Sequence, residues 1–162
     1  MNQNINTTYK PEYNTRIVHF WLLGLLFLLL LMILIGGLTR LTDSGLSITN
    51  WEPIIGAIPP LSNTDWVLAF DQYKLTNEFK IQNFNMDLME LKVIYWWEWG
   101  HRQLGRIIGL VWFFGFIYLL SFGKIQKPWR LRLLLIGALI GVQGTVGSVS
   151  YTHLRAHETF AN

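Results

Sequence analysis

The stretch that decides the fold runs from Ile17 to Ile35 and reads IVHFWLLGLLFLLLLMILI. Only His19 and Gly24 interrupt its apolar side chains, and the run is as long as a bilayer-crossing helix needs to be. No small-residue cleavage site follows it, and it is longer than the apolar core of a typical signal peptide. We therefore expect a retained membrane anchor.

Two further segments have the same character, and the composition agrees with them. Residues 93–122 and 131–147 are mostly apolar. The whole chain is 51% hydrophobic and only 14% charged, whereas a soluble domain normally carries about 25% charged residues. We predict an all-α integral membrane protein with about three transmembrane helices, over 17–37, over 93–122, and with the start of the third over 131–147.

Positive charge is concentrated at one end of these helices. Lys10 and Arg16 precede the first segment, and the stretch 38–92 carries four basic and seven acidic residues. The connection between the second and third segments contains four basic residues and no acidic one: Lys124, Lys127, Arg130 and Arg132. By the positive-inside rule, we expect residues 1–16 and 123–130 in the cytoplasm and the loop 38–92 outside.

This topology explains the net charge of +3, which gives no reason to expect a nucleic-acid partner. The absence of cysteine excludes a disulfide framework and thiolate-bound metals. Residues 1–15 lack the arginine-rich amphipathic pattern of a mitochondrial targeting segment. We therefore expect a multi-pass protein of a bacterial inner membrane rather than a mitochondrial one.

The outer loop 38–92 is rich in aromatic residues and prolines, so it is more than a linker. Ser62 or Asn63 can cap a short helix that places three aromatic residues on one face: Trp66, Phe70 and Tyr73. Asn85 can cap a second helical start that leads into the second membrane segment. A loop of this length is typical of a lid over a functional site.

Glycines predict where the membrane helices end and how they pack. Gly36 and Gly37 are expected to end the first helix, since the chain can turn sharply there. Glycines four residues apart occur at 105 and 109 and again at 137 and 141. Small residues at this spacing allow close helix approach, so we expect the second and third helices to pack together in a bundle.

A carboxylate and an imidazole lie at the mouth of the second segment. Residues 95–102 read YWWEWGHR, so Glu98 and His101 are three positions apart and about 60° apart around a helix. Ionisable side chains in a membrane helix are costly and mark a functional site by default. We predict that Glu98 is a catalytic group that moves protons or stabilises charge. His101 is predicted as an axial ligand of haem iron, and the alternative is an interfacial acid beside a histidine in contact with lipid headgroups.

Two arginines follow on the same predicted helix. Arg102 and Arg106 are one turn apart, and guanidinium groups match the geometry of carboxylates. We predict that they hold haem propionates. The alternative is that they reach toward the membrane surface, although Arg106 lies rather deep for that. The tryptophans of this stretch fit an aromatic belt at the outer interface: Trp96, Trp97 and Trp99.

Other polar residues have simpler interpretations. His19 is expected at an interface, and Asp43 and Glu52 are expected to make local turn and cap hydrogen bonds. His153 and His157 have the spacing of a metal site, but residues 149–159, VSYTHLRAHET, match one reading frame of a transposase sequencing adapter. We interpret residues 148–162 as foreign sequence with no biological role.

Taken together, these motifs resemble the haem A synthase family, membrane enzymes of cytochrome oxidase biogenesis. The resemblance covers nearly everything from the first apolar segment to Gly147, and a series of motifs in the right order is a strong signal. It rests on residues 36–47 (GGLTRLTDSGLS), on Trp51-Glu52-Pro53 with Gly56 and Pro59-Pro60-Leu61, on residues 96–102 (WWEWGHR) with Gly105-Arg106, and on Gln143-Gly144.

The resemblance implies an eight-helix protein made of two similar four-helix bundles, each with a pair of histidines facing a haem. It also implies oxidation of the methyl group of haem O to a formyl group by successive hydroxylation, which gives haem A. Within the family, Glu98 matches the catalytic carboxylate and His101 the haem-ligating histidine. A haem b in the other bundle serves electron transfer. The implied partners are haem O, haem O synthase, an unidentified electron donor, the bilayer and a second copy of the chain. The cysteine-free loop matches the branch without loop cysteines.

The chain departs from the family in what it lacks. The histidine that pairs with His101 should come from a fourth transmembrane helix, and the second bundle should bring its own pair. The chain therefore holds one histidine ligand of four. We expect the 162-residue product to be inactive alone, whereas its longer parent makes haem A.

Two other classes remain open. The first is a cytochrome b-type electron-transfer protein that binds haem without modifying it. The second is a non-enzymatic assembly factor that uses its outer loop to bind oxidase subunits. Glu98 distinguishes the enzyme from both, because an electron carrier has no need of a costly carboxylate beside the ligand.

Overall fold

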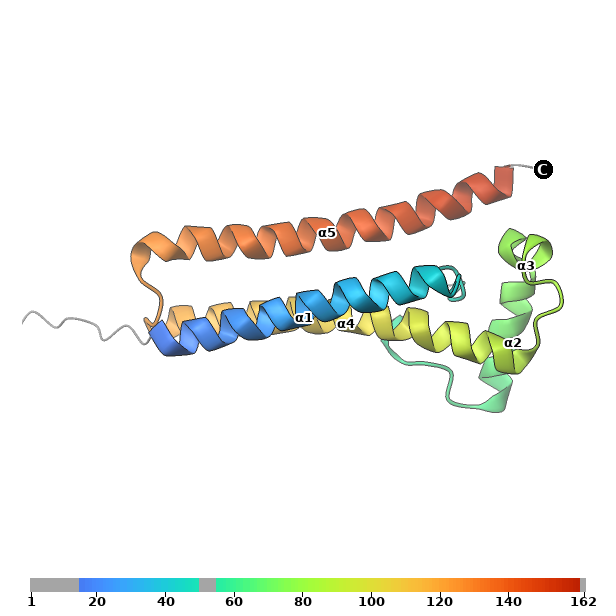
Figure 1. Cartoon of the computed structure of the whole chain (residues 1–162), viewed down its shortest axis with the longest axis horizontal. Coiled ribbons are helices and arrows are strands. Elements are labelled where there is room, and N and C mark those ends of the chain that lie inside the picture. Colours follow the sequence, from blue (N-terminus) through green and yellow to red (C-terminus); the bar gives the residue numbers. More distant parts are fainter. Residues whose placement is uncertain (1–14, 50–54, 161–162) are drawn as a thin grey trace, which may run out of the picture.

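The computed structural model describes the backbone of residues 15–49 and 55–160, and the side chains of 16–49 and 56–147. Within these residues the protein is all-helical. The elements are α1 (Thr15–Leu41), the 3₁₀ turn η1 (Ile55–Ala57), α2 (Asn63–Lys74), α3 (Asn77–Ile81), α4 (Leu88–Ser121) and α5 (Lys127–Phe160), and their order is shown in Figure 1.

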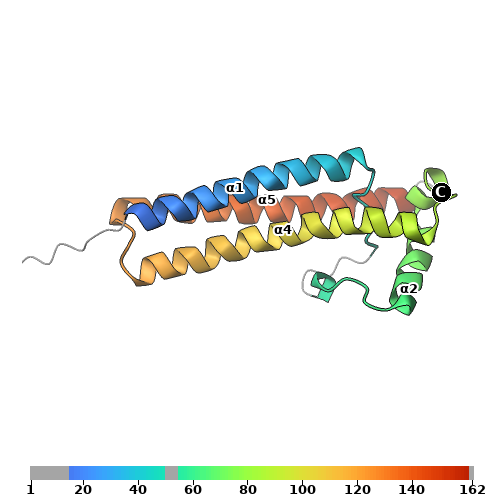
Figure 2. The same cartoon turned by 60° about the horizontal axis from the view of Figure 1, so that its bottom comes forward.

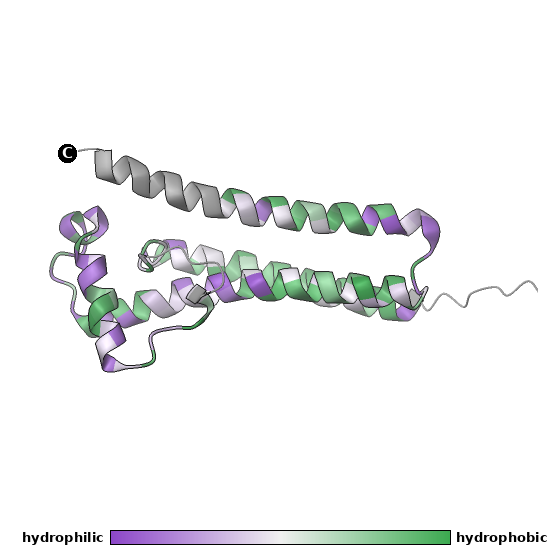
Figure 3. Cartoon of the chain, turned by 180° about the vertical axis from the view of Figure 1, so that it is seen from behind, coloured by the Kyte–Doolittle hydropathy of each residue, from purple (hydrophilic) through white to green (hydrophobic). Residues whose placement is uncertain are grey.

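Three long helices lie lengthwise beside one another, and the short helices gather at one end. Figures 1 and 2 show α5 running alongside the pair of α1 and α4, with α2 and α3 at the end where α4 begins. The helices that are long and apolar enough to cross a membrane span Arg16–Leu41, Leu88–Ser121 and Lys127–Gly147. Hydrophobic residues follow them along their length, and hydrophilic residues are frequent around α2 and α3 (Figure 3). The predicted all-α membrane class and its three membrane helices are confirmed.

The expected end of the first helix at Gly36 and Gly37 was wrong, because α1 continues to Leu41. Inside a membrane an interrupted helix leaves backbone groups without water, so glycines there are tolerated within an intact helix. The helix ends at a turn in which Asp43 has φ 47°. This left-handed conformation is one that aspartate adopts more readily than most residues.

Glycines on α4 receive large side chains from α1. The Trp21 indole occupies the place that a Cβ at Gly115 would take, and its Nε1 donates to the Val111 carbonyl over 3.1 Å. The Met32 methyl group lies 3.2 Å from the position of a Cβ at Gly105. These notches bring α1 and α4 close together along their length.

The prediction that α4 packs against α5 was right, but the residues that make the contact differ from those predicted. The Trp112 indole of α4 fills the space beside Gly137, and its Nε1 donates to the Leu133 carbonyl over 3.3 Å. A Cβ at Gly109 or Gly141 would meet open space among the described atoms. The contact is therefore made by a tryptophan against one glycine, and the four-residue glycine spacing does not create it.

The end of the bundle away from α2 has its own apolar core. Buried residues from α4, the connection and α5 form it, and partly buried residues from α1 pack against it. The buried members are Phe116, Leu119, Ile125 and Leu133. Because α4 ends at Ser121 and α5 begins at Lys127, the connection is shorter than the predicted 123–130. The α5 backbone stays helical to Phe160, and the interpretation of residues 148–162 as foreign sequence stays a prediction.

The outer loop folds over the first turns of α4. Ser62, one of the two predicted candidates, is the N-cap of α2 and forms a capping box with Asp65. Trp66 and Tyr73 on the predicted aromatic face are buried, against Tyr95 and Leu91 of α4 respectively. These two clusters hold α2 across the end of α4.

The predicted cap at Asn85 was wrong, because Asp87 is the N-cap of α4. Its side chain accepts from the Glu90 amide over 2.8 Å, and the Glu90 carboxylate accepts from the Asp87 amide over 3.0 Å. This reciprocal capping box satisfies two backbone donors at once, which a cap at Asn85 does not offer.

Candidate functional site

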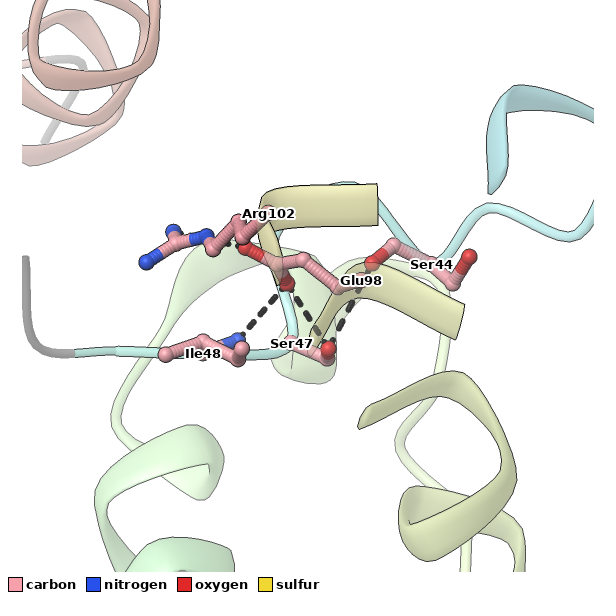
Figure 4. A network of polar contacts seen from close by, with 5 residues as sticks. All are labelled: Ser44, Ser47, Ile48, Glu98 and Arg102. Atoms are coloured by element: carbon pink, nitrogen blue, oxygen red, sulfur yellow. Dashed lines mark hydrogen bonds and ion pairs between the residues drawn. The ribbon is translucent and has the colours of Figure 1, made fainter. Parts of the chain in front are cut away.

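The centre of the site is Glu98, a carboxylate that is only 4% exposed. Its Oε2 atom accepts two hydrogen bonds of 2.8 Å, from the Ser47 hydroxyl and from the Ile48 amide. Its Oε1 atom lies 2.7 Å from Nη2 of Arg102, one helical turn further along α4. Figure 4 shows these partners converging on the carboxylate from two sides. A buried charge must be paired and hydrogen-bonded to be tolerated, and this carboxylate is both.

The segment after α1 is shaped so that it can reach Glu98. The Ser44 amide and hydroxyl both donate to the Thr39 carbonyl, each over 3.0 Å. The Thr42 and Ser44 hydroxyls are 2.8 Å apart. These bonds satisfy the end of α1 and turn the chain back toward α4. Ser44 is fully buried and Ser47 is 2% exposed, so the hydroxyl that meets Glu98 is shielded from water.

A second part of the outer loop is fixed to the same turns of α4. The Ala57 carbonyl accepts from Trp99 Nε1 over 3.2 Å and also from the Gln103 side-chain amide. Trp99 also packs against the buried cluster of Ile48, Trp66 and Tyr95. The loop therefore covers the part of α4 that carries Glu98 and His101.

His101 lies on the side of α4 that faces α1. Its imidazole is partly buried, and its Nε2 atom would be 3.1 Å from a Cβ built at Gly36. Gly36 thus provides the space that the ring occupies. His101 would hold a haem through this imidazole, whose Nε2 atom lies against α1 at Gly36.

The donor set suits a haem better than a free metal ion. Among the residues that the structure describes, no group of three or more His, Cys, Asp or Glu side chains could hold a metal ion. A haem brings four nitrogen ligands of its own and needs few ligands from the protein, and a histidine imidazole is a common one. The residue types present fit a haem, which His101 would hold.

The two predicted propionate ligands differ in their surroundings. Arg102 makes the ion pair with Glu98, so its guanidinium is directed at a carboxylate of the chain itself. Arg106 lies one turn deeper on α4 and is partly buried. Their assignment to haem propionates stays a prediction, as do the roles of Glu98 and His101.

The remaining candidates lie apart from this site. Trp96 and Trp97 are 46% and 36% exposed, as a belt residue would be, whereas Trp99 is turned toward the loop. His19 is exposed on α1, and the exposed Asp43 donates its amide to the Arg40 carbonyl over 3.4 Å. Residue 52 and the side chains at 153 and 157 lie outside the described residues.

Sequence reasoning missed three residues of the site: Ser47, Ile48 and Gly36. The stretch 36–47 was recognised as a motif, but its turn-forming composition gave no sign of which residue meets Glu98. No local pattern could have shown a contact between positions 51 residues apart.

These features define a class: all-α membrane proteins with a buried carboxylate and a histidine one turn apart beneath a folded outer loop. A family model described as cytochrome oxidase assembly protein matches residues 19–157. The chain belongs to this cytochrome oxidase assembly protein family. The matched region extends into residues 148–157 and so includes part of the segment interpreted as foreign.

Curated relatives of the chain carry the name Heme A synthase. This chain is 57% identical to the relative from Ruegeria pomeroyi, over 81% of this chain and 34% of the relative. It is 58% identical to that of Dinoroseobacter shibae over 80% of this chain and 34% of the relative. For Cereibacter sphaeroides the identity is 53%, over 80% of this chain and 33% of the relative. The chain thus spans about a third of the length of these relatives. No solved structure matches it.

Proposed function

We propose that this chain is the first part of a haem A synthase, which oxidises the methyl group of haem O to a formyl group. The observation that carries the proposal is Glu98, which is buried one helical turn from His101 and is held by two hydrogen-bond donors and an ion pair with Arg102. The relatives named Heme A synthase support the reaction. Since the chain spans a third of their length, we expect it to be inactive without the remainder.

We assign each residue of the site a proposed role. His101 would hold the haem, which supplies the redox chemistry, and Arg106 would bind a propionate. Glu98 would take up or release a proton at Oε1 or Oε2 beside the reacting group. Arg102 balances the charge of Glu98. The burial of Glu98 excludes water that would compete for the reacting group.

The charge pattern of the sequence supports an expected setting for the reaction. Basic residues flank α1 and fill the connection between α4 and α5, which supports a cytoplasmic N-terminus in a bacterial inner membrane. Haem O synthase would deliver the substrate, an electron donor would supply electrons, and a haem b in the other bundle would serve electron transfer. A second copy of the chain is a further expected partner.

A cytochrome b-type electron carrier is the second candidate, since His101 alone would serve it as well. Glu98 argues against it, because a carrier does not need a buried carboxylate that requires three partners to be tolerated.

A chimera tests the proposal. Residues 1–147 would replace the matching third of the Ruegeria pomeroyi relative, in a bacterium without its own haem A synthase. We expect haem A in extracts, its loss in Glu98→Gln with haem b still bound, and full activity in the matched control Glu90→Gln, a capping residue of α4 outside the site. Retained haem A in Glu98→Gln would contradict the proposal, and a chimera that binds haem b and never forms haem A would favour the electron carrier.

A further inference from the structure

The outer loop contributes two of the three polar partners of Glu98, and Arg102 of α4 is the third. Both reach the same oxygen, Oε2, and both come from adjacent residues just after α1: the Ser47 hydroxyl and the Ile48 amide, each at 2.8 Å. The other oxygen, Oε1, is engaged by Arg102. The carboxylate is therefore fixed in rotation as well as in position, since each oxygen has its own partner.

The Ser47 hydroxyl has only one proton to donate. Two acceptors lie within reach, Glu98 Oε2 at 2.8 Å and the Ser44 carbonyl at 3.4 Å. The shorter contact has the geometry of a strong hydrogen bond to a charged acceptor, and the longer one is at the limit. Ser47 therefore serves the carboxylate first.

Capping of α1 does not explain Ser47. The Thr39 carbonyl at the end of that helix accepts from the amide and hydroxyl of Ser44. Ser47 lies three residues further on, is 2% exposed and directs its hydroxyl across to α4. With both groups buried, water cannot easily replace this donor.

We propose that Ser47 is a positioning residue for Glu98: its hydroxyl sets the orientation of the carboxylate, so that the outer loop becomes part of the reaction site. The inference rests on the proposed catalytic role of Glu98. The contact itself can be tested without turnover.

The first test is infrared spectroscopy of the whole 162-residue chain in lipid discs. The carboxylate band of Glu98 is assigned from the difference between the unchanged chain and Glu98→Gln. We expect Ser47→Ala to shift this band and Ser47→Thr, which keeps the hydroxyl, to retain it. Ser44→Ala is the matched control, because it removes an equally buried hydroxyl that does not contact Glu98.

An unshifted band in Ser47→Ala would overturn the inference, and so would an equal shift in Ser44→Ala. If Ser47→Ala loses its helical circular dichroism, Ser47→Cys takes its place, because a thiol has nearly the same size and is a weaker donor. The band should then shift in the same direction by a smaller amount, and no shift would again overturn the inference.

The second test uses the chimera. Ser47→Ala should lower kcat about ten- to a hundredfold, the range expected for a hydrogen bond to a charged group. KM for haem O should stay unchanged, and Ser47→Thr should restore most of kcat. A rise in KM alone would contradict a positioning role. If the band shifts but Glu98→Gln keeps full activity, the proposed function fails while the contact stands.

Discussion

The guanidinium of Arg102 lies 2.7 Å from the carboxylate of Glu98, one turn away on α4, with both side chains largely buried. Glu98 also receives the two loop donors, so the pair is one of the points at which α4 and the outer loop are joined. The sequence predicted that Arg102 binds a haem propionate, whereas in the structure its guanidinium pairs with Glu98. The consequences of breaking it can be measured.

Removal of Arg102 should destabilise the protein much more when Glu98 is present than when Glu98 has been replaced by glutamine. Arg102→Met leaves a buried carboxylate without its counter-charge, at a cost of about 3 kcal/mol in the free energy of unfolding. In the Glu98→Gln background the same substitution should cost much less, because a neutral amide needs no counter-charge. Denaturant unfolding of the four variants in mixed micelles measures this coupling. Equal costs in the two backgrounds would show that the pair does not interact.

A methyl group at Gly36 should disturb His101. Gly36→Ala places its Cβ 3.1 Å from the imidazole Nε2 atom, so the ring must shift by a few tenths of an ångström. Gly37→Ala is the matched control, since its Cβ would meet open space among the described atoms. We expect the His101 ring resonances in NMR spectra of the chain to move in the first variant and stay in place in the second. Identical spectra would mean that His101 does not face Gly36.

Much of the fold and the centre of the site could be predicted because their signals are local. Apolar runs of membrane length gave the three long helices, and Ser62 gave the start of α2. Glu98 and His101 stood out because ionisable groups are costly in such helices. The helix ends were harder to predict, since the N-cap depends on which of several nearby side chains forms a capping box. At α4 Asp87 forms it, because Glu90 lies three residues further along the chain.

The partners of Glu98 could not be predicted because they depend on how distant segments meet. Residues 39–47 contain several hydroxyl side chains, and their composition alone does not distinguish one hydroxyl from another. Which hydroxyl reaches α4 depends on the left-handed conformation of Asp43 and on the bond from the Ser44 amide back to the Thr39 carbonyl of α1. The inward direction of Trp99 was within reach of sequence reasoning, since it lies one helical turn from Tyr95, which shares its cluster.

The notch between α4 and α5 should not accept a side chain. A Cβ at Gly137 would overlap the Trp112 indole, whereas one at Gly141 would meet open space in the described part of the chain. Gly137→Ala should therefore destabilise the helix pair by about 1–3 kcal/mol, as overpacking does. Gly141→Ala should be neutral or slightly stabilising, because alanine favours helix. Thermal unfolding compares the two, with tryptophan fluorescence reporting on Trp112. Equal unfolding temperatures would place α5 elsewhere.

Tyr73 should remain a neutral phenol well into the alkaline range. Burial raises the pKa of Tyr73 from its ordinary value near 10 to about 12, although the hydrogen bond from Asn83 acts in the opposite direction. Because the folded-state pKa lies above the unfolded one, the stability contribution is complete below pH 10 and is lost as the pH rises toward 12. We expect phenolate absorbance in the difference between the unchanged chain and Tyr73→Phe to appear only near pH 12.

The same titration reports on the packing of the outer loop. Tyr73 is fully buried against Leu91 of α4, so its late ionisation depends on α2 staying in place. Ser62→Ala, which removes the N-cap of α2, should loosen this contact at a cost of about 1 kcal/mol, and the Tyr73 midpoint should then move back toward 10. Asn83→Ala serves as the opposite control, because loss of its hydrogen bond to the phenol oxygen should move the midpoint upward. A midpoint near 10 in the unchanged chain would mean that α2 does not cover Tyr73 against α4.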